Sequence, residues 1–243
     1  MAGLCSVRRG LAGFGKGANG AEREKDMAAY RVKLTGIRPI LLHWDNIGWQ
    51  DMLAKWRSVP ENKKESVPGD DRSPAMTWKG YTYNDGENVV IPYDNIRSCL
   101  MAAGKKVPKG KGRGSMKAEA ASAIIIDSMY VPLLVNGKTI SWPAIEAIDG
   151  KFSDHVTAAR NLGFDLFVKR AKVGQSKHIR VRPIFDKWSL QFDADILDDS
   201  LTQDVLVDLF RMAGKYVGLG DWRPGSEKSP GPYGMFTADV SPL

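Results

Sequence analysis

The chain has 243 residues, 43% of them hydrophobic, and a formal net charge of +7. Cys5 and Cys99 are its only cysteines, and no apolar run approaches the roughly 20 residues of a bilayer-spanning helix. These features exclude a disulfide framework and a membrane-spanning chain, and we expect a cytoplasmic protein. We interpret residues 1–26 as a disordered N-terminal extension and residues 27–243 as a single domain.

The first predicted strand covers residues 30–42, where apolar residues alternate with polar ones in its first half. Pro39 cannot donate to a strand ladder, so we expect the strand to end or bend there. Residues 45–88 follow as a long insertion with a short helix over residues 49–56 and a polar remainder. A loop of this length inside a compact domain is often functional or mobile.

A short strand over residues 89–92 precedes the next predicted helix, which ends at Gly104. A second insertion follows over residues 105–122, and its first part is too basic and too rich in Gly to bury a core. Residues 123–135 indicate a second strand region, and Asn136-Gly137 predicts a hairpin turn.

The third insertion, residues 143–187, contains a predicted basic hairpin with strands at about 165–173 and 178–184. Residues 188–196 then give the clearest strand, because every second residue is apolar. The last predicted helix has its apolar residues at helical spacing and ends at Gly218; they are Val205, Leu209, Met212, Ala213 and Tyr216. A Gly-rich and Pro-rich loop and a final strand complete the chain.

The coarse order is strand, helix, strand region, strand, helix, strand, with insertions. This order is typical of the ferredoxin-like fold that RNA-recognition domains also use. The predicted fold class is therefore α+β, with an antiparallel sheet, two helices, a long insertion and a projecting basic β-hairpin, or thumb.

Positive charge gathers in two windows that contain no acid. These windows hold twelve basic residues, more than the net charge of +7, so the rest of the chain is net acidic. We predict that both windows contact nucleic-acid phosphates. The predicted contacts are Lys105, Lys106, Lys109, Lys111, Arg113 and Lys117 in the first window, and Lys169, Arg170, Lys172, Lys177, Arg180 and Arg182 in the second.

Each candidate has a structural alternative. The first window is alternatively a solvated basic loop, and the hairpin charges alternatively protect an exposed strand edge. In the Gly-rich loop, Trp222 and Arg223 are candidates to stack on a base and hold a phosphate, whereas Trp222 alternatively packs the loop onto the domain.

We expect no cofactor and no metal, because the sequence has no phosphate-binding loop, dinucleotide fingerprint, nucleophile elbow or zinc-ligand spacing. His43 follows the first strand, where a general base for RNA cleavage would fit, although a lone His is more often structural. The loop acids Asp45, Asp51, Asp70 and Asp71 are further candidates for such a reaction.

Three segments together resemble the repeat-associated mysterious protein (RAMP) superfamily, and within it the backbone subunits of CRISPR effector complexes. RVKLTGIRPILLHW (31–44) resembles its opening strand. VIPYDNIRSCL (90–100) resembles its isoleucine-proline motif through Ile91, Pro92, Ile96 and Arg97, with Tyr93, Asp94 and Asn95 in place of the usual Gly and Ser. The stretch 218–236 occupies the place of its Gly-rich loop and is longer.

The resemblance implies binding of single-stranded RNA on an RNA-recognition-like sheet, head-to-tail stacking of subunits and a thumb hairpin. It favours a non-catalytic protein that binds single-stranded RNA or DNA and associates with itself or with other CRISPR effector subunits, encoded by a CRISPR locus, a phage or another mobile element. One alternative is a RAMP-like RNA endonuclease that uses His43 or a nearby Asp. Another is a mimic that binds and blocks a CRISPR effector complex.

Overall fold

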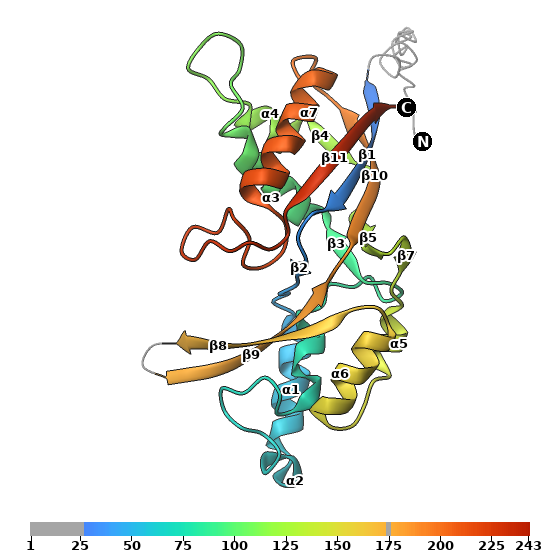
Figure 1. Ribbon diagram of the computed structural model, residues 1–243, viewed down its shortest axis with the longest axis vertical. Helices are drawn as coiled ribbons and strands as arrows, with labels where there is room; N and C mark the ends of the chain where they lie inside the picture. The colour runs from blue at the N-terminus through green and yellow to red at the C-terminus, as the bar shows by residue number, and fades with distance from the viewer. Residues whose placement is uncertain (1–26, 174–175) are drawn as a thin grey trace, which may run out of the picture.

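The computed structural model describes residues 27–173 and 176–243. The predicted extension, residues 1–26, and the tip of the predicted hairpin near Gly174 lie outside the described residues. Figure 1 shows an elongated molecule with a sheet lobe and a helical lobe. Its sheets are antiparallel and its helices are several, so the protein belongs to the predicted α+β class.

The two lobes use different parts of the chain. The sheet lobe holds β1 (Ala28–Gly36), β4 (Ile124–Ile126), β10 (Trp188–Ile196), β11 (Phe236–Pro242), α3 (Tyr93–Gly104), α4 (Lys117–Ser122) and α7 (Gln203–Met212). The helical lobe holds α1 (Ile47–Ser58), α2 (Pro60–Lys63), the 3-10 helix η2 (Ala75–Tyr81), α5 (Trp142–Glu146), α6 (Phe152–Asn161) and the hairpin strands β8 (Asp165–Val173) and β9 (Ser176–Phe185). The short strand β2 (Ile40–Leu41) pairs with β9, after the break that Pro39 predicted.

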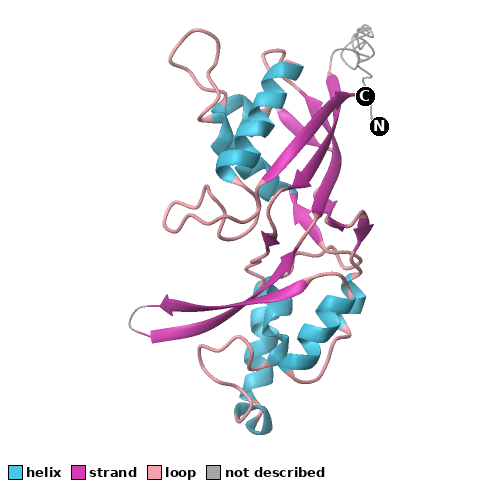
Figure 2. Ribbon diagram, in the orientation of Figure 1, coloured by secondary structure: helices cyan, strands magenta, loops and turns pink. Residues whose placement is uncertain are grey.

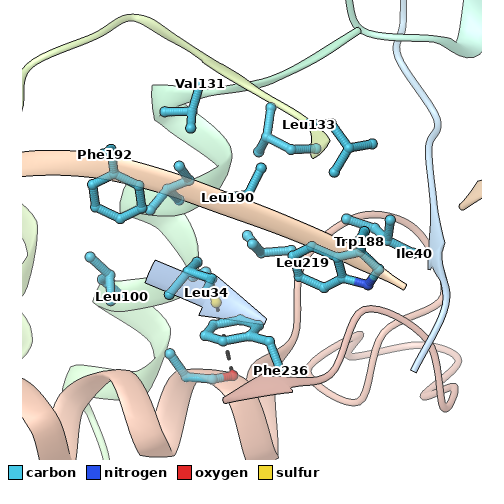
Figure 3. Packing of buried hydrophobic residues seen from close by; sticks show 14 of the residues in the cluster. Leu34, Ile40, Leu100, Val131, Leu133, Trp188, Leu190, Phe192, Leu219 and Phe236 are labelled. Atoms are coloured by element: carbon cyan, nitrogen blue, oxygen red, sulfur yellow. Dashed lines mark hydrogen bonds between the residues drawn. The ribbon is translucent and has the colours of Figure 1, made fainter. Parts of the chain in front are cut away.

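The main sheet has the strand order β11–β1–β10, and beyond β10 it continues both with β4 and with the short strands β6 (Leu134–Val135) and β7 (Lys138–Thr139). Every neighbouring pair is antiparallel. Strand β10 coincides with the predicted strand and buries alternate residues, from Trp188 to Ile196. Helices α3 and α7 cover one face of this sheet (Figure 2). Figure 3 shows the resulting core, where Leu34, Leu190 and Phe236 pack together.

The other face of the main sheet is open and polar. The outward residues of β1, β10 and β11 are Ala29, Arg31, Lys33, Thr35, Ser189, Gln191, Asp193, Asp195, Thr237, Asp239 and Ser241. None of them is aromatic, and the Arg31 guanidinium is paired with Asp193 at 2.8 Å. RNA-recognition sheets stack bases on aromatic side chains, and these strands offer none on this face.

The predicted strand region over residues 123–135 is confirmed, and the chain divides it into three short strands. After β4 it turns away from β10, and β5 (Tyr130–Pro132) pairs with β3 (Val90–Pro92) before β6 (Leu134–Val135) returns to β10. The predicted turn at Asn136-Gly137 is confirmed, with φ angles of 51° and 78°, and it leads into β7 (Lys138–Thr139).

The polar insertion 45–88 is more ordered than its composition suggested. It contains α1, α2 and η2, and η2 buries Trp78 completely. The Trp78 Nε1 donates to His155 Nδ1 at 3.1 Å, which joins this insertion to α6 of the third insertion. The insertions at 45–88 and 143–187 therefore build the helical lobe together.

Candidate nucleic-acid interface

The hairpin β8–β9 is confirmed close to its predicted bounds and projects from the body of the molecule (Figure 1). Its register pairs Lys169 with Arg180 and Phe167 with Arg182, so these four side chains share one face. Arg170 alternates to the opposite face. The predicted pairing of Arg180 and Arg182 on one face is therefore confirmed.

A groove of about 550 Å³ lies between this hairpin and the Gly-rich loop, residues 218–235. We name it the hairpin groove. Its lining contains six basic residues and one acid: Lys169, Arg170, Lys172, Arg180, Arg182, Lys228 and Asp221. Five of the six predicted hairpin contacts line this groove, and Lys177 is the exception.

The Gly-rich loop is docked by its backbone. Leu219 donates to the Gly234 carbonyl at 2.9 Å, and Asp221 donates to the Leu41 carbonyl at 2.8 Å. Gly234 has φ = 66°, and a Cβ there would overlap the Leu219 carbonyl, so the close approach requires glycine. These contacts fix the loop against β2 and make it one wall of the hairpin groove.

Trp222 occupies the centre of an aromatic cluster at the base of this wall. Its ring centroid lies 6.3 Å from that of Phe167 and 5.3 Å from that of Tyr233. The Lys169 ammonium stands over the Trp222 ring, 3.0 Å from its centroid. A base can stack on this face of Trp222 only after Lys169 moves, so the geometry favours the packing alternative for Trp222.

Arg182, a predicted phosphate contact, is already engaged by carboxylates of the protein. Its side chain is only 12% exposed and lies between the carboxylates of Asp71 and Asp221, at 3.4 Å from each. Its guanidinium also covers the Tyr81 ring at 4.2 Å. Arg180 is 33% exposed and pairs with Asp71 at 3.0 Å. Both arginines are oriented by Asp71, which is 6% exposed.

Arg223 is also engaged within the loop, where its Nη1 donates to the Gly220 carbonyl at 3.0 Å. It lines a separate hollow of about 270 Å³ with His43, Asn95 and Ser98. The structure therefore separates Trp222 and Arg223, which the sequence predicted as a pair, into two neighbouring hollows.

His43 is tied to the same charged network. Arg182 Nη2 donates to His43 Nε2 at 3.2 Å, which leaves the imidazole proton on Nδ1, 3.7 Å from Asp221 Oδ2. The surrounding protein and the positive Arg182 lower the pKa of His43, against the opposing effect of Asp221. Neither ring nitrogen is then free to accept a proton from a substrate.

The other candidate residues for catalysis are dispersed. The Asp70 carboxylate pairs with Arg72 at 2.7 Å, and Asp71 is buried between the hairpin arginines. Among residues 27–173 and 176–243, no cluster of three or more His, Cys, Asp or Glu residues could hold a metal ion.

The first basic window forms the loop between α3 and α4, away from the hairpin groove. Lys109 is paired with Glu119, and Lys106 lies 5.9 Å from the Tyr216 ring centroid. The remaining predicted contacts of this window are exposed; they are Lys105, Lys111, Arg113 and Lys117. This loop, the Gly-rich loop and the hairpin project toward the same side in Figure 1.

Sequence reasoning missed two residues that line the groove, Asp221 and Lys228, and one that orients its arginines, Asp71. Asp71 lies 109 residues before Arg180, and no local pattern marked it as a hairpin partner. Asp221 and Lys228 lie within the Gly-rich loop that the sequence singled out. Lys228 is basic, which is the feature that identified the other predicted contacts, and it is exposed beside the basic hairpin.

No helix in the described part of the chain has the length and apolar character that crossing a bilayer requires. Comparison of the sequence with models of protein families and with curated proteins finds no match to either.

Proposed function

We propose that the protein is a non-catalytic, single-stranded nucleic-acid-binding protein whose main site is the hairpin groove. The observation that carries this proposal is the concentration of six basic side chains and one carboxylate along one groove of about 550 Å³. Lys and Arg neutralise phosphates and release counterions, which gives affinity with little sequence preference. The open face of the sheet supports this choice of site, because the outward residues of β1, β10 and β11 include no aromatic side chain for base stacking and Arg31 is already paired with Asp193.

The arrangement of the sheet lobe supports a ferredoxin-like fold. Helix α3 connects β1 to the strand region that begins with β4, and α7 connects β10 to β11. The order β11–β1–β10–β4 is the one that two such strand–helix–strand units produce. In this proposal the protein is a relative of CRISPR backbone subunits, from a CRISPR locus, a phage or another mobile element, and its preferred strand is RNA.

The proposal includes assembly along the strand. The α3–α4 loop carries a second set of exposed basic residues on the side where the hairpin projects. One strand passing both surfaces would continue onto a neighbouring copy and raise its effective concentration. Light scattering with oligonucleotides of increasing length would then show a mass that grows with length. A constant one-to-one complex would contradict assembly and leave simple binding intact.

The test of the groove removes three basic residues that form no ion pair in the described residues. Arg170, Lys172 and Lys228 are exposed, so their joint replacement by Ala should leave the fold intact. Because each lost phosphate contact changes the salt dependence of single-strand binding by about 0.7, the slope of log K against log salt should fall by about 2.

The matched control replaces three exposed lysines outside the groove with Ala, namely Lys33, Lys63 and Lys138. Fluorescence anisotropy with labelled oligouridine measures both sets. Equal loss of affinity in both variants would reject the groove as the site. Incubation of the RNA with native protein and with His43→Ala tests catalysis: cleavage that disappears in the variant would replace binding by the endonuclease alternative.

A further inference from the structure

The face of the hairpin that lines the hairpin groove also lines a second hollow, on the β9 side. This hollow has a volume of about 340 Å³ and is lined by Gln50 and Arg57 of α1, the loop 66–71, Tyr81, His178 and Arg180. We name it the α1 hollow. Arg180 lines both hollows, and they therefore adjoin at this residue.

The hairpin register places the two hollows side by side across the strands. Lys169 on β8 pairs with Arg180 on β9, and Ala171 pairs with His178, all on the same face. The hairpin groove extends over the β8 side of this face, and the α1 hollow extends over the β9 side. A chain that crosses the hairpin at right angles to its strands passes from one hollow to the other.

The far wall of the α1 hollow is fixed to the hairpin by backbone hydrogen bonds. Ile179 donates to the Gly69 carbonyl at 2.8 Å, and Asp71 donates to the Ile179 carbonyl at 3.0 Å. The loop 66–71 therefore extends the hairpin sheet beyond β9, with a parallel bridge between Asp70 and Ile179. Figure 1 shows α1 and this loop on the side of the hairpin opposite the Gly-rich loop.

The acids of this wall are already neutralised. Asp70 is paired with Arg72 at 2.7 Å, and this neighbouring guanidinium holds the pKa of the Asp70 carboxyl below its usual range. Asp71 is shared by Arg180 and Arg182. Arg57 is exposed in the last turn of α1, and no ion pair joins it to a carboxylate within the described residues. The α1 hollow thus offers an anion a free guanidinium and the Gln50 amide.

We propose that the nucleic-acid strand bound in the hairpin groove continues past Arg180 into the α1 hollow, where Arg57 binds a phosphate of the same strand. This inference rests on the proposed function. It adds a contact from a helix outside both basic windows of the sequence, and it makes the site longer than the hairpin groove alone. Arg57 acts only on strands long enough to span both hollows.

The experiment compares Arg57→Ala with Lys55→Ala, a matched control that removes an equal charge from an exposed residue in the last turn of the same helix. Oligouridines of about 4 to about 16 nucleotides cover the range of single-strand site sizes. We expect both variants to bind the shortest oligonucleotides like the native protein. On longer ones, Arg57→Ala should bind about two- to fivefold more weakly, with a salt slope smaller by about 0.7.

Two results would overturn this inference while leaving the proposed function intact. In one, Arg57→Ala behaves like Lys55→Ala at every length. In the other, it weakens the shortest oligonucleotides as much as the longest, which would make Arg57 part of the same hollow as the hairpin residues. If the native protein binds no oligouridine at any length, the proposed function fails and this inference fails with it. Thermal melts of both variants establish that the fold is unchanged.

Discussion

Replacing Arg182 with Ala should destabilise the fold. The Arg182 side chain is 12% exposed, lies 3.4 Å from the carboxylates of both Asp71 and Asp221, and donates to the Val181 carbonyl at 3.1 Å. Its guanidinium also lies 4.2 Å from the centroid of the Tyr81 ring. The Ala variant loses all of these contacts together and leaves a cavity in the place of the Arg182 side chain.

The size of this stability loss depends on the contacts that Asp71 and Asp221 retain in the variant. Removing one member of a buried ion pair costs about 3–5 kcal/mol, because it leaves an uncompensated buried charge. Asp71 keeps its ion pair with Arg180 at 3.0 Å, and the Asp221 side chain is 37% exposed to solvent. Neither carboxylate is therefore left as a buried charge without compensation. We therefore expect the lower end, a loss of about 3 kcal/mol in the free energy of unfolding. For a chain of this size that corresponds to a fall in Tm of about 6–12 °C.

Thermal and urea unfolding followed by circular dichroism measure this loss, and Arg170→Ala, an exposed hairpin arginine, is the matched control for stability alone. Arg182→Lys should rescue little, because an ammonium cannot reproduce the fork of the guanidinium between two carboxylates. The reasoning is refuted if Arg182→Ala melts like the native protein and loses oligonucleotide affinity as strongly as the groove variant. Arg182 would then be the phosphate contact that the sequence predicted.

Three further predictions concern single residues. Trp222→Ala should destabilise the fold by about 2 kcal/mol, since the half-buried ring is lost, whereas Lys169→Ala should uncover the ring and shift its fluorescence emission. Burial and the positive charge of Lys79 lower the pKa of His155, so the unfolded state binds the proton of this imidazole more readily than the folded state. The free energy of unfolding should therefore fall as the pH drops below about 6.5. In urea melts, His155→Gln should flatten this pH dependence. Burial raises the pKa of Cys99 to about 12, so in a Cys5→Ser background a thiol reagent should label it only after unfolding, and rapid labelling of the native protein would contradict this burial.

Elements specified by local signals were predictable from the sequence. Strand β10 needed only its alternation of apolar and polar residues, and the turn at Asn136-Gly137 needed only its two residue types. The hairpin β8–β9 was found from its length and charge. In each case residues close together in the chain carry the whole signal, so no knowledge of tertiary packing was required.

The last helix shows where the local pattern failed. Its predicted apolar stripe ended at Tyr216, which is 44% exposed, whereas Gly214 and Val217 are buried. The reason is the π-helical turn η3 (Ala213–Val217), whose wider turn rotates the face that follows it. Gly214 lies against β11, and only glycine fits there because a Cβ would overlap the Phe236 carbonyl. The contact that fixes this face comes from β11, which follows only after the Gly-rich loop.

The candidate site was predictable as a set of charges but not as an arrangement. The sequence identified the hairpin residues through their density, and five of the six line one groove. It assigned Arg170 and Arg182 the same role, although the first is exposed and the second is 12% exposed between two carboxylates. The difference depends on Asp71, which the insertion 45–88 supplies and which looked like an ordinary loop acid.

The paired and the unpaired basic residues of the groove therefore have different physical roles. Arg180 and Arg182 share Asp71, so much of their charge is already neutralised, and their position is fixed before any ligand arrives. A fixed guanidinium loses little side-chain entropy on binding, and what it contributes is register. In the proposed complex, exposed residues such as Lys172 neutralise phosphates, and the counterions that this releases from the nucleic acid drive affinity. Changing Asp71 should therefore alter where a strand lies in the groove, whereas changing Lys172 should alter how steeply its binding depends on salt.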